Sequence, residues 1–282
     1  MITENINNNS DISAQPFVKW AGGKRQLLNE ILPRVPSSFD TYYEPFVGGG
    51  AVLFALKHDK SVINDINSHL ILSYKAIRDT PQDLMDLLDY YDGIKLNATI
   101  YKEFREKYNS HIKKNINNLE TAALFIYLNK HCFNGLYRVN SKGFFNVPWN
   151  KKEYVASYNK ENIIHIAKFL QNVKIKNEDF SLSVNNASKN DFIFFDSPYA
   201  PLNPSSFTAY DKAGFKVEEH ERLANLFKDL DSKGVYCMLT NHNTKLIQEL
   251  YKDYKIEEVN VRRSINSDST KRIGKELIIT NY

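Results

Sequence analysis

Residues 191–201 read DFIFFDSPYAP, in which four apolar residues follow one another without alternation and then stop at an acid and a proline-containing turn. An unbroken apolar run bounded by turn residues is typical of a strand that is buried on both faces of a parallel sheet. The pattern therefore predicts a central strand over residues 192–195. It also places the Asp196 carboxylate at the carboxyl end of that strand, the edge where open α/β sheets bind ligands.

Strand and helix patterns alternate on both sides of this stretch. Upstream, TYYEPFV leads through three glycines into AVLFALK, and SVIND leads into INSHLILSYKAIRD; downstream, the alternation resumes with ENIIHIAKFLQN. Such alternation predicts an α/β protein with a parallel sheet covered by helices. We therefore expect a disordered tail at 1–15, an α/β domain built from 16–80 and 161–282, and a mainly helical insertion at 81–160.

The composition is that of an ordinary globular protein. Of the 282 residues, 42% are hydrophobic and 25% are charged, and no apolar run reaches the ~18 residues that a membrane helix needs. The polar, Asn-rich N-terminus has no apolar core of a signal peptide, so we expect a cytoplasmic protein without membrane association. Cys132 and Cys237 lack the paired spacing of a disulfide framework or a zinc site, and no metal is expected.

Positive charge is concentrated in the predicted insertion. Residues 101–160 hold 11 Lys and Arg against 4 Asp and Glu, which gives +7 in a chain of net charge +4 and leaves −3 for the rest. A basic segment of this kind is typical of a surface that faces a polyanion such as nucleic acid. A face that is merely solvated has the same composition and is the alternative.

A glycine turn joins the first predicted strand to its helix in EPFVGGGAVLFAL, residues 44–56. Glycines permit a tight turn and let a ligand approach backbone N–H groups at a helix N-terminus. Asp65 follows 17 residues after Gly48, near the ~20 residues at which nucleotide-binding folds place an acid for ribose hydroxyls. Leu53 stands where a dinucleotide fingerprint has its third glycine, which favours an adenosyl ligand without a pyrophosphate. A structural turn beside an unrelated acid is the alternative.

A second glycine pair lies in KWAGGKRQLL, residues 19–28. It is not a phosphate-binding P-loop, because the required Gly and Ser or Thr are absent around Lys24. Taken alone, this stretch indicates a helix start with a solvated Lys24 and an ordinary core residue at Trp20.

The residues after the central strand form a stiff clamp. Pro198 keeps Ser197 extended and fixes its own φ angle, while Tyr199 supplies a flat ring with few rotamers. The Asp196 carboxylate, the Ser197 carbonyl and this ring suit a planar heterocycle that carries an exocyclic amino group. Its two N–H donors would go to the carboxylate and to the carbonyl. A core strand that simply ends in a turn is the alternative interpretation.

Five segments converge on one family: FVKWAGGKRQLL, YYEPFVGGGAVLFAL, INDINSHLI, CFNGLYRVNSKGFFNVPW and FFDSPYAPL. In this order and at fitting intervals they resemble the signature segments of Dam-like (D12 class) N6-adenine DNA methyltransferases, the group that includes the DpnII-type GATC methylases. The resemblance covers the chain from about residue 16 to its end, including FTAYDKAGF and RRSINSDSTKR. It implies a Rossmann-like class I methyltransferase sheet that binds S-adenosylmethionine, with an inserted target-recognition domain that contains a β-hairpin.

The resemblance also implies roles for individual residues. Asp65 matches the ribose-binding acid, Asp179 lies where the family places a residue near the adenine of the methyl donor, and Asp196 lies between the donor and the target base. The residues implied for binding the methyl donor are Trp20, Lys24, Glu44, Phe46, Gly48, Gly50, Asp65, Asp179 and Asp196. The residues implied for the catalytic motif are Asp196, Ser197, Pro198 and Tyr199.

Methyl transfer to N6 of adenine makes physical sense in this motif. The N6 lone pair is delocalised into the ring, and hydrogen bonds from N6–H to Asp196 and to the Ser197 carbonyl favour a more nucleophilic nitrogen. Positioning and fixed dipoles then supply most of the rate, and the base must leave the duplex to reach the site. Ser197 replaces the first proline of the family's Asp-Pro-Pro-Tyr, so we expect activity with a looser clamp.

Residues 133–149 interleave aromatic and basic side chains, which suits stacking on bases and contact with phosphates. A buried hairpin with a polar rim is the alternative. By resemblance, this hairpin enters double-stranded DNA at GATC, where Arg138 reads a guanine and Phe133 wedges beside the flipped adenine. The other residues that we expect to contact DNA are Asn134, Leu136, Asn140 and Pro148. Further candidates for phosphate contacts, each equally well a solvated side chain, are Arg262, Arg263, Lys271 and Arg272.

Three other functions compete with this one. A cytosine-C5 methyltransferase needs a nucleophilic Cys, typically after Pro, but Cys132 follows a histidine and Cys237 follows a tyrosine. An amino-methyltransferase acting on RNA or on protein glutamine would share the clamp without the basic aromatic hairpin. A relative that binds DNA but cannot transfer methyl groups is the third alternative, and Ser197 would account for the lost activity. The sequence leaves open whether a restriction endonuclease accompanies the protein, and a monomer is assumed.

Overall fold

The computed structural model describes residues 14–202, 215–262 and 273–282. Most of the predicted tail at 1–15 lies outside these residues, as do Arg263, Lys271 and Arg272. Of Arg262 only the backbone is described.

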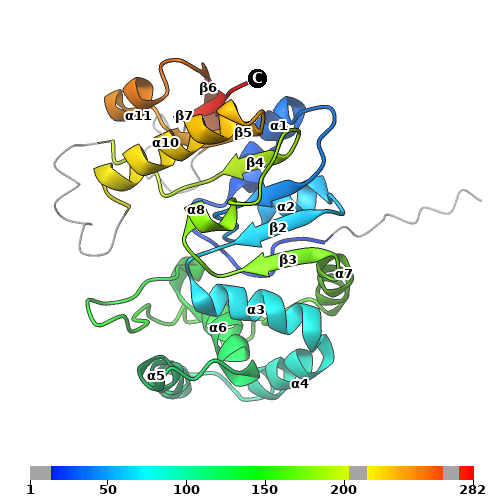
Figure 1. Cartoon of the computed structure of the whole chain (residues 1–282). Coiled ribbons are helices and arrows are strands. Elements are labelled where there is room, and N and C mark those ends of the chain that lie inside the picture. The colour runs from blue at the N-terminus through cyan, green and yellow to red at the C-terminus, as the bar shows by residue number, and fades with distance from the viewer. Residues whose placement is uncertain (1–13, 203–214, 263–272) are drawn as a thin grey trace, which may run out of the picture.

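The described residues form a seven-stranded sheet at the centre of the molecule, in the order β3-β2-β1-β4-β5-β7-β6 (Figure 1). The first five strands are parallel, and β7 lies antiparallel between β5 and β6. This topology is that of a Rossmann-like methyltransferase sheet and confirms the predicted fold class. The strands are β1 (Tyr42–Glu44), β2 (Ser61–Asn64), β3 (Val173–Lys176), β4 (Phe192–Phe195), β5 (Tyr236–His242), β6 (Lys255–Arg262) and β7 (Ile273–Thr280).

Strand β4 lies in the middle of the sheet and is buried on both faces, as its unbroken apolar run predicted. Its four side chains are all fully buried. Phe192 and Phe194 belong to the hydrophobic core on one face, whereas Ile193 and Phe195 belong to the core on the other. Because side chains alternate along a strand, only a residue run that is apolar at every position fills both cores at once.

Helices cover both faces of the sheet. α10 and α11 lie over one face, and α3 and α7 lie over the other (Figure 1). In the described residues no helix is long and apolar enough to cross a membrane. The helices are α1 (Leu28–Ile31), α2 (Ala51–Leu56), α3 (Ser68–Asp79), α4 (Pro81–Asp92), α5 (Ala98–Lys114), α6 (Leu119–His131), α7 (Lys160–Leu170), α8 (Phe180–Ser183), α10 (Val217–Ser232) and α11 (Lys245–Leu250), with short 3-10 turns at Lys24–Leu27, Leu32–Arg34 and Phe133–Gly135.

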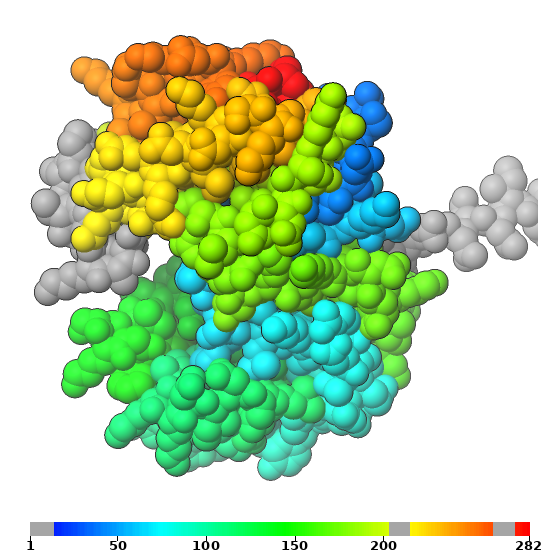
Figure 2. All heavy atoms as spheres, viewed as in Figure 1, coloured from blue at the N-terminus to red at the C-terminus, as the bar shows by residue number. Residues whose placement is uncertain are grey.

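The segment 81–160 forms α4, α5, α6 and a hairpin-like stretch, which together make up the lower end of the molecule (Figure 2). α6 is buried at every position from Thr121 to Asn129 and contacts α3, α4 and α5. A helix that is apolar on all sides is typically the centre of a helical layer. The same hydrophobic core runs from the sheet into this layer without a break. The division into two domains stays a prediction.

Candidate active site

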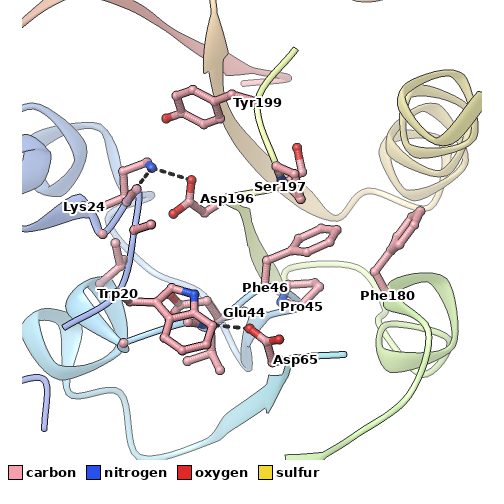
Figure 3. A pocket seen from close by; sticks show the side chains of 18 of the residues that line it. Trp20, Lys24, Glu44, Pro45, Phe46, Asp65, Phe180, Asp196, Ser197 and Tyr199 are labelled. Atoms are coloured by element: carbon pink, nitrogen blue, oxygen red, sulfur yellow. Dashed lines mark hydrogen bonds and ion pairs between the residues drawn. The ribbon is translucent and has the colours of Figure 1, made fainter. Parts of the chain in front are cut away.

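A cavity of about 1060 Å³ opens at the edge of the sheet where the parallel strands end (Figure 3). Three acids reach it from neighbouring strands, because Glu44 ends β1, Asp65 follows β2 and Asp196 follows β4. The lining contains every residue that the sequence assigned to the methyl donor and to the catalytic motif: Trp20, Lys24, Glu44, Phe46, Gly48, Gly50, Asp65, Asp179, Asp196, Ser197, Pro198 and Tyr199. The predicted DNA-binding residues are not part of this lining.

The glycine turn is packed closely against the aromatic side chains of Trp20 and Tyr74, which explains two of its glycines. Gly48 and Gly50 have φ angles of 48° and 75°, in the region that disfavours side chains. A Cβ atom on Gly48 would lie 2.6 Å from Cδ1 of Trp20, and one on Gly50 would lie 2.6 Å from the hydroxyl of Tyr74. Both positions therefore need glycine for backbone conformation and for space. Trp20 covers the turn as part of the cavity wall.

Asp65 ties the glycine turn to the start of α3. Its carboxylate accepts hydrogen bonds from the backbone N–H of Gly48 at 3.1 Å and of Asn67 at 2.9 Å. Asn67 in turn caps α3 by accepting the N–H of Leu70. Burial raises the pKa of Asp65 to about 6, against the opposing effect of the two N–H donors. The acid is thus held rigidly at the cavity wall and titrates close to neutral pH.

Glu44 is a buried acid in the cavity wall. The hydroxyl of Tyr42 donates to its carboxylate at 2.9 Å, and the backbone N–H of Leu53 in the first turn of α2 points at it. Burial raises the pKa of Glu44 well above its usual value, and the nearby Asp196 carboxylate adds to this effect.

Asp196 is paired with a buried lysine (Figure 3). The ammonium of Lys24 lies 2.6 Å from Oδ1 of Asp196 and donates to the backbone oxygen of Gly22 at 2.6 Å. The same ammonium stands 4.5 Å from the centre of the Tyr199 ring. Thr240 on β5 donates a further hydrogen bond to Oδ1 at 3.0 Å. Burial raises the pKa of Asp196, while Lys24 opposes this rise. The interpretation of Lys24 as a solvated side chain is wrong, since only 5% of its surface is exposed.

Strands β5 and β7 hold the rest of the clamp. The hydroxyl of Tyr199 donates to Glu276 on β7 at 2.7 Å, and His242 packs its edge against the Tyr199 ring. Asn241 on β5 accepts the backbone N–H of Ala200 at 2.9 Å. We did not predict Glu276, which lies 77 residues from its partner on a strand inserted between β5 and β6. Thr240 could have been predicted as a site residue, because it is a polar residue near the carboxyl end of VYCMLTN, the strand beside β4.

The opposite end of the cavity is aromatic. Phe46 and Phe180 lie with their ring centres 5.3 Å apart, and the guanidinium of Arg222 stands 4.1 Å over the Phe180 ring. Both terminal nitrogens of Arg222 bind the carboxylate of Asp179, at 2.8 and 2.7 Å, and hold its pKa well below the usual range. The Asp179 carboxylate also caps α8 through Ser181. It is therefore already engaged, whereas the rings of Phe46 and Phe180 line the cavity.

The 133–149 hairpin is clamped to α5. Its strands meet in antiparallel bridges between Cys132 and Trp149 and between Val139 and Phe145. Asn109 on α5 accepts the N–H of Phe145 at 2.8 Å and donates to its carbonyl at 3.0 Å. At the hairpin base, Phe133 donates its N–H to the carbonyl of Pro148, and both side chains are exposed. The buried-hairpin alternative holds for Phe145 but not for these two residues.

The remaining predicted DNA-binding residues line the hairpin in different ways. Arg138 is exposed and its Nε donates to Asn146 on the facing strand at 2.9 Å; within the described part of the chain no partner engages its two terminal nitrogens. Asn140 accepts the N–H groups of Lys142 and Phe144, so it caps the turn. Asn134 has a φ of 57° and is exposed, whereas Leu136 is half-buried against the core.

The strand order and the acids at the carboxyl edge of the sheet define a Rossmann-like methyltransferase. The sequence matches the D12 class N6 adenine-specific DNA methyltransferase family over residues 20–265. The chain belongs to this family and is therefore an adenine-specific methyltransferase that acts on DNA.

Named relatives cover nearly the whole chain. It is similar to the type II methyltransferase M1.LlaDCHI of Lactococcus lactis subsp. cremoris, with 41% identity over 99% of both chains. It is also similar to the type II methyltransferase M.MjaIII of Methanocaldococcus jannaschii, with 39% identity over 96% of this chain and 100% of that one. The DNA adenine methylase of Escherichia coli K12 shares 34% identity over 94% of each chain.

Proposed function

We propose that this protein transfers a methyl group from S-adenosylmethionine to N6 of an adenine that has been flipped out of a GATC site in double-stranded DNA. The proposal adds the donor, the recognition sequence and the flipped base to the family's activity. The observation that carries it is the environment of the Lys24 ammonium. This cationic amino group is bound by the Asp196 carboxylate and by a backbone carbonyl, and it lies over the Tyr199 ring.

An adenine amino group needs partners of the same three kinds. Its two N–H donors require two acceptors, and its ring requires an aromatic face. Asp196 and Tyr199 supply the carboxylate and the face, and the carbonyl of Ser197 follows directly in the chain. Lys24 therefore occupies the position that we assign to the target amino group. It must withdraw from the Asp196 carboxylate before an adenine enters.

The cavity fits S-adenosylmethionine in size and in chemistry. Its volume of about 1060 Å³ is slightly above the ~300–1,000 Å³ that is typical of small-molecule sites, which leaves room for a nucleoside and a second planar ring. Asp65 offers a rigid acceptor for ribose hydroxyls, and Phe46 and Phe180 offer apolar ring faces for an adenine. Trp20 and the Gly48 turn complete the wall at which the backbone comes close to a ligand.

When bound, the donor supplies an electrophilic methyl group. The residues of the chain then have three tasks. Asp196 and the Ser197 carbonyl hold the N6 hydrogens and so orient the nitrogen lone pair. Tyr199, fixed by Glu276, holds the plane of the base. Thr240 keeps the Asp196 carboxylate in place after Lys24 has moved. Fixed acceptors of this kind need no rearrangement during the reaction, which is why they accelerate it.

The proposed function is tested by expressing the protein in a host that lacks adenine methylation. Plasmid from this host is digested with one nuclease that cuts only unmethylated GATC and with another that cuts only N6-methylated GATC. Resistance to the first and cleavage by the second is the expected result. Sensitivity to the first, together with N6-methyladenine detected by mass spectrometry, would overturn GATC but not the reaction. Absence of N6-methyladenine would overturn the reaction itself.

Replacing Asp65 by Asn should weaken binding of S-adenosylhomocysteine about tenfold at pH 7.5. The amide presents one N–H₂ group to two backbone donors, which leaves a buried donor without a partner, and such losses cost ~1–3 kcal/mol. In the wild type, affinity should fall as the pH drops through about 6, because Asp65 then becomes protonated. The variant should lose this pH dependence, as measured by calorimetry between pH 5 and 8.

Asp179→Asn is the matched control for this pH profile. Its carboxylate is paired with Arg222 and has a pKa far below this pH range, so the variant should keep the wild-type dependence. A wild-type affinity that does not change between pH 5 and 8 would contradict the assignment of Asp65.

Replacing Ser197 by Pro should raise kcat about two- to fivefold. The Ser197 side chain is buried and its hydroxyl has no hydrogen-bond partner in the described residues, so its loss costs nothing. A proline that fits fixes the φ angle at this position and so stiffens the clamp in the folded protein. Ser197→Ala, which removes only the hydroxyl, should leave kcat unchanged in the same single-turnover assay. Equal rates for the two variants would show that rigidity at this position is irrelevant.

Replacing Arg138 by Gln should lower kcat/KM for a GATC duplex by about 5- to 150-fold, since a bidentate contact to guanine is worth ~1–3 kcal/mol. Discrimination against duplexes altered at that guanine should disappear. Lys142→Gln, on the turn of the same hairpin, removes one exposed charge and should weaken all duplexes alike. Uniform weakening by the Arg138 variant as well would reduce Arg138 to a phosphate contact.

A further inference from the structure

One buried amide connects the first segment of the cavity wall to the hairpin. Asn129, in the buried stretch of α6, is 1% exposed. Its Oδ1 accepts the backbone N–H of Lys19 at 2.9 Å, and its Nδ2 donates to the carbonyls of Lys19 at 2.9 Å and of Gly135 at 3.0 Å. In the sequence, Lys19 lies 110 residues before Asn129 and Gly135 lies 6 residues after it. The amide thus connects Lys19, which precedes Trp20 in the cavity wall, to Gly135 in the hairpin.

Two further contacts connect the same two parts of the chain, the cavity wall at Lys19 and Trp20 and the hairpin at Gly135 and Tyr137. The rings of Trp20 and Tyr137 are stacked, with centres 5.7 Å apart and planes inclined by 20°. Gly135 has a φ of 65°, and a Cβ atom on it would lie 2.5 Å from Cβ of Lys19. Trp20 therefore lies between the Gly48 turn on one side and the hairpin ring of Tyr137 on the other. The hairpin and the cavity wall are therefore in direct side-chain contact.

We propose that Asn129 is a positioning residue that couples the methyl-donor site to DNA recognition, so that donor and duplex each strengthen binding of the other. The inference rests on the proposed function, because it takes residues 17–24 as part of the donor site and residues 133–149 as the DNA-reading hairpin. Asn129 touches neither ligand. It acts by fixing the backbone of Lys19 relative to that of Gly135.

The physical argument concerns which atoms each ligand orders. A donor on the Gly48 turn restricts Trp20, which packs on that turn, and through the stacked rings it restricts Tyr137. A duplex bound to the hairpin restricts Tyr137 and, through the stacked rings, Trp20. The second ligand then binds a segment that is already ordered, so it loses less conformational freedom. Coupling of this kind is reciprocal and typically changes affinity ~5- to 150-fold.

The hairpin offers a matched control. Asn109 clamps Phe145 through both its N–H and its carbonyl, in the same manner as Asn129 clamps Lys19, but it connects the hairpin only to α5. Asn129→Leu and Asn109→Leu each remove one side-chain amide that holds the hairpin. Only the first of them removes hydrogen bonds that connect the hairpin to residues 17–24.

The test measures the affinity of S-adenosylhomocysteine with and without a saturating GATC duplex, by calorimetry on the full chain. We expect about tenfold tighter binding with the duplex in the wild type and in Asn109→Leu. In Asn129→Leu the ratio should fall below twofold, and the affinity of the duplex should become equally insensitive to S-adenosylhomocysteine. Tyr137→Leu, which removes the stack but keeps the amide, should reduce the ratio as well and serves if the Asn129 variant does not fold.

Three outcomes would overturn the inference. The first is a wild type in which the duplex does not change the affinity for S-adenosylhomocysteine, and the second is a wild-type affinity ratio in Asn129→Leu or, if that variant does not fold, in Tyr137→Leu. The third is an affinity ratio that falls as far in Asn109→Leu as in Asn129→Leu. The last would assign the effect to the integrity of the hairpin alone. A wild type that binds neither S-adenosylhomocysteine nor the duplex is a different result, because it would contradict the proposed function on which the inference rests.

Discussion

Asp196→Asn should lower kcat about 10²- to 10³-fold, the range measured when one preorganised hydrogen-bonding group is removed from an active site. Lys24 and Thr240 both donate to Oδ1 of Asp196 in the structure, so the amide would keep its oxygen at that position. Its N–H₂ group would then replace Oδ2, the oxygen that is left to accept the N6 hydrogen. Single-turnover transfer to a GATC duplex measures the loss.

Binding separates this effect from a folding defect. The Asp196 variant should keep its affinity for the GATC duplex, because the hairpin residues lie outside the cavity. Thr240→Val removes only the hydrogen bond that orients the Asp196 carboxylate and should lower kcat about tenfold or less. A kcat for Asp196→Asn within tenfold of the wild type would show that another group holds the target amine.

Lys24→Met should move the acid limb of the pH profile of kcat/KM upward by about one pH unit or more. Burial raises the pKa of Asp196, and Lys24 opposes that rise through its charge and its hydrogen bond. A neighbouring cation typically lowers the pKa of a carboxyl by ~1–3 units. The mechanism requires Asp196 to accept two hydrogen bonds, one from N6–H and one from Thr240, and only the ionised carboxylate has both oxygens free to accept them. Without the lysine, protonation of Asp196 sets in at higher pH, so activity falls earlier as the solution is acidified.

Lys24→Arg is the matched control, since it keeps a cation beside Asp196 and should keep the acid limb near its wild-type position. The Met variant should approach wild-type activity at high pH, where Asp196 is ionised without help. If its kcat/KM is low at every pH and the limb does not move, Lys24 has another role, such as a direct contact with a ligand. Initial rates between pH 5.5 and 9 distinguish these results.

Much of the active-site framework could be predicted because it depends on patterns that are local in sequence. Phe192 to Phe195 have only apolar side chains, and this alone requires burial on both faces of a sheet. A chain that leaves such a strand must turn at its carboxyl end, so the position of Asp196 follows from the strand. The glycines at 48 and 50 and the acid at 65 were predicted in the same way.

The sequence could not reveal which residues meet across the cavity. Lys24 in isolation indicated a solvated side chain, yet it forms a buried ion pair with an acid 172 residues away. Glu276 reaches Tyr199 only because β7 enters the sheet between β5 and β6 in the antiparallel direction. Arg222 meets Asp179 only because α10 packs beside α8 at the end of the cavity.

Patterns that are local in sequence therefore predicted the elements, the edge of the sheet at which the cavity opens and, through five ordered motifs, the family. The tertiary structure brought the partners together: Lys24 with Asp196, Glu276 with the Tyr199 ring, and the amide of Asn129 with both the cavity wall and the hairpin. The physical reason is that strand and helix formation depends on side-chain periodicity over a few residues. Side-chain pairing depends on the order of strands and on the packing of helices, which no short stretch of sequence specifies.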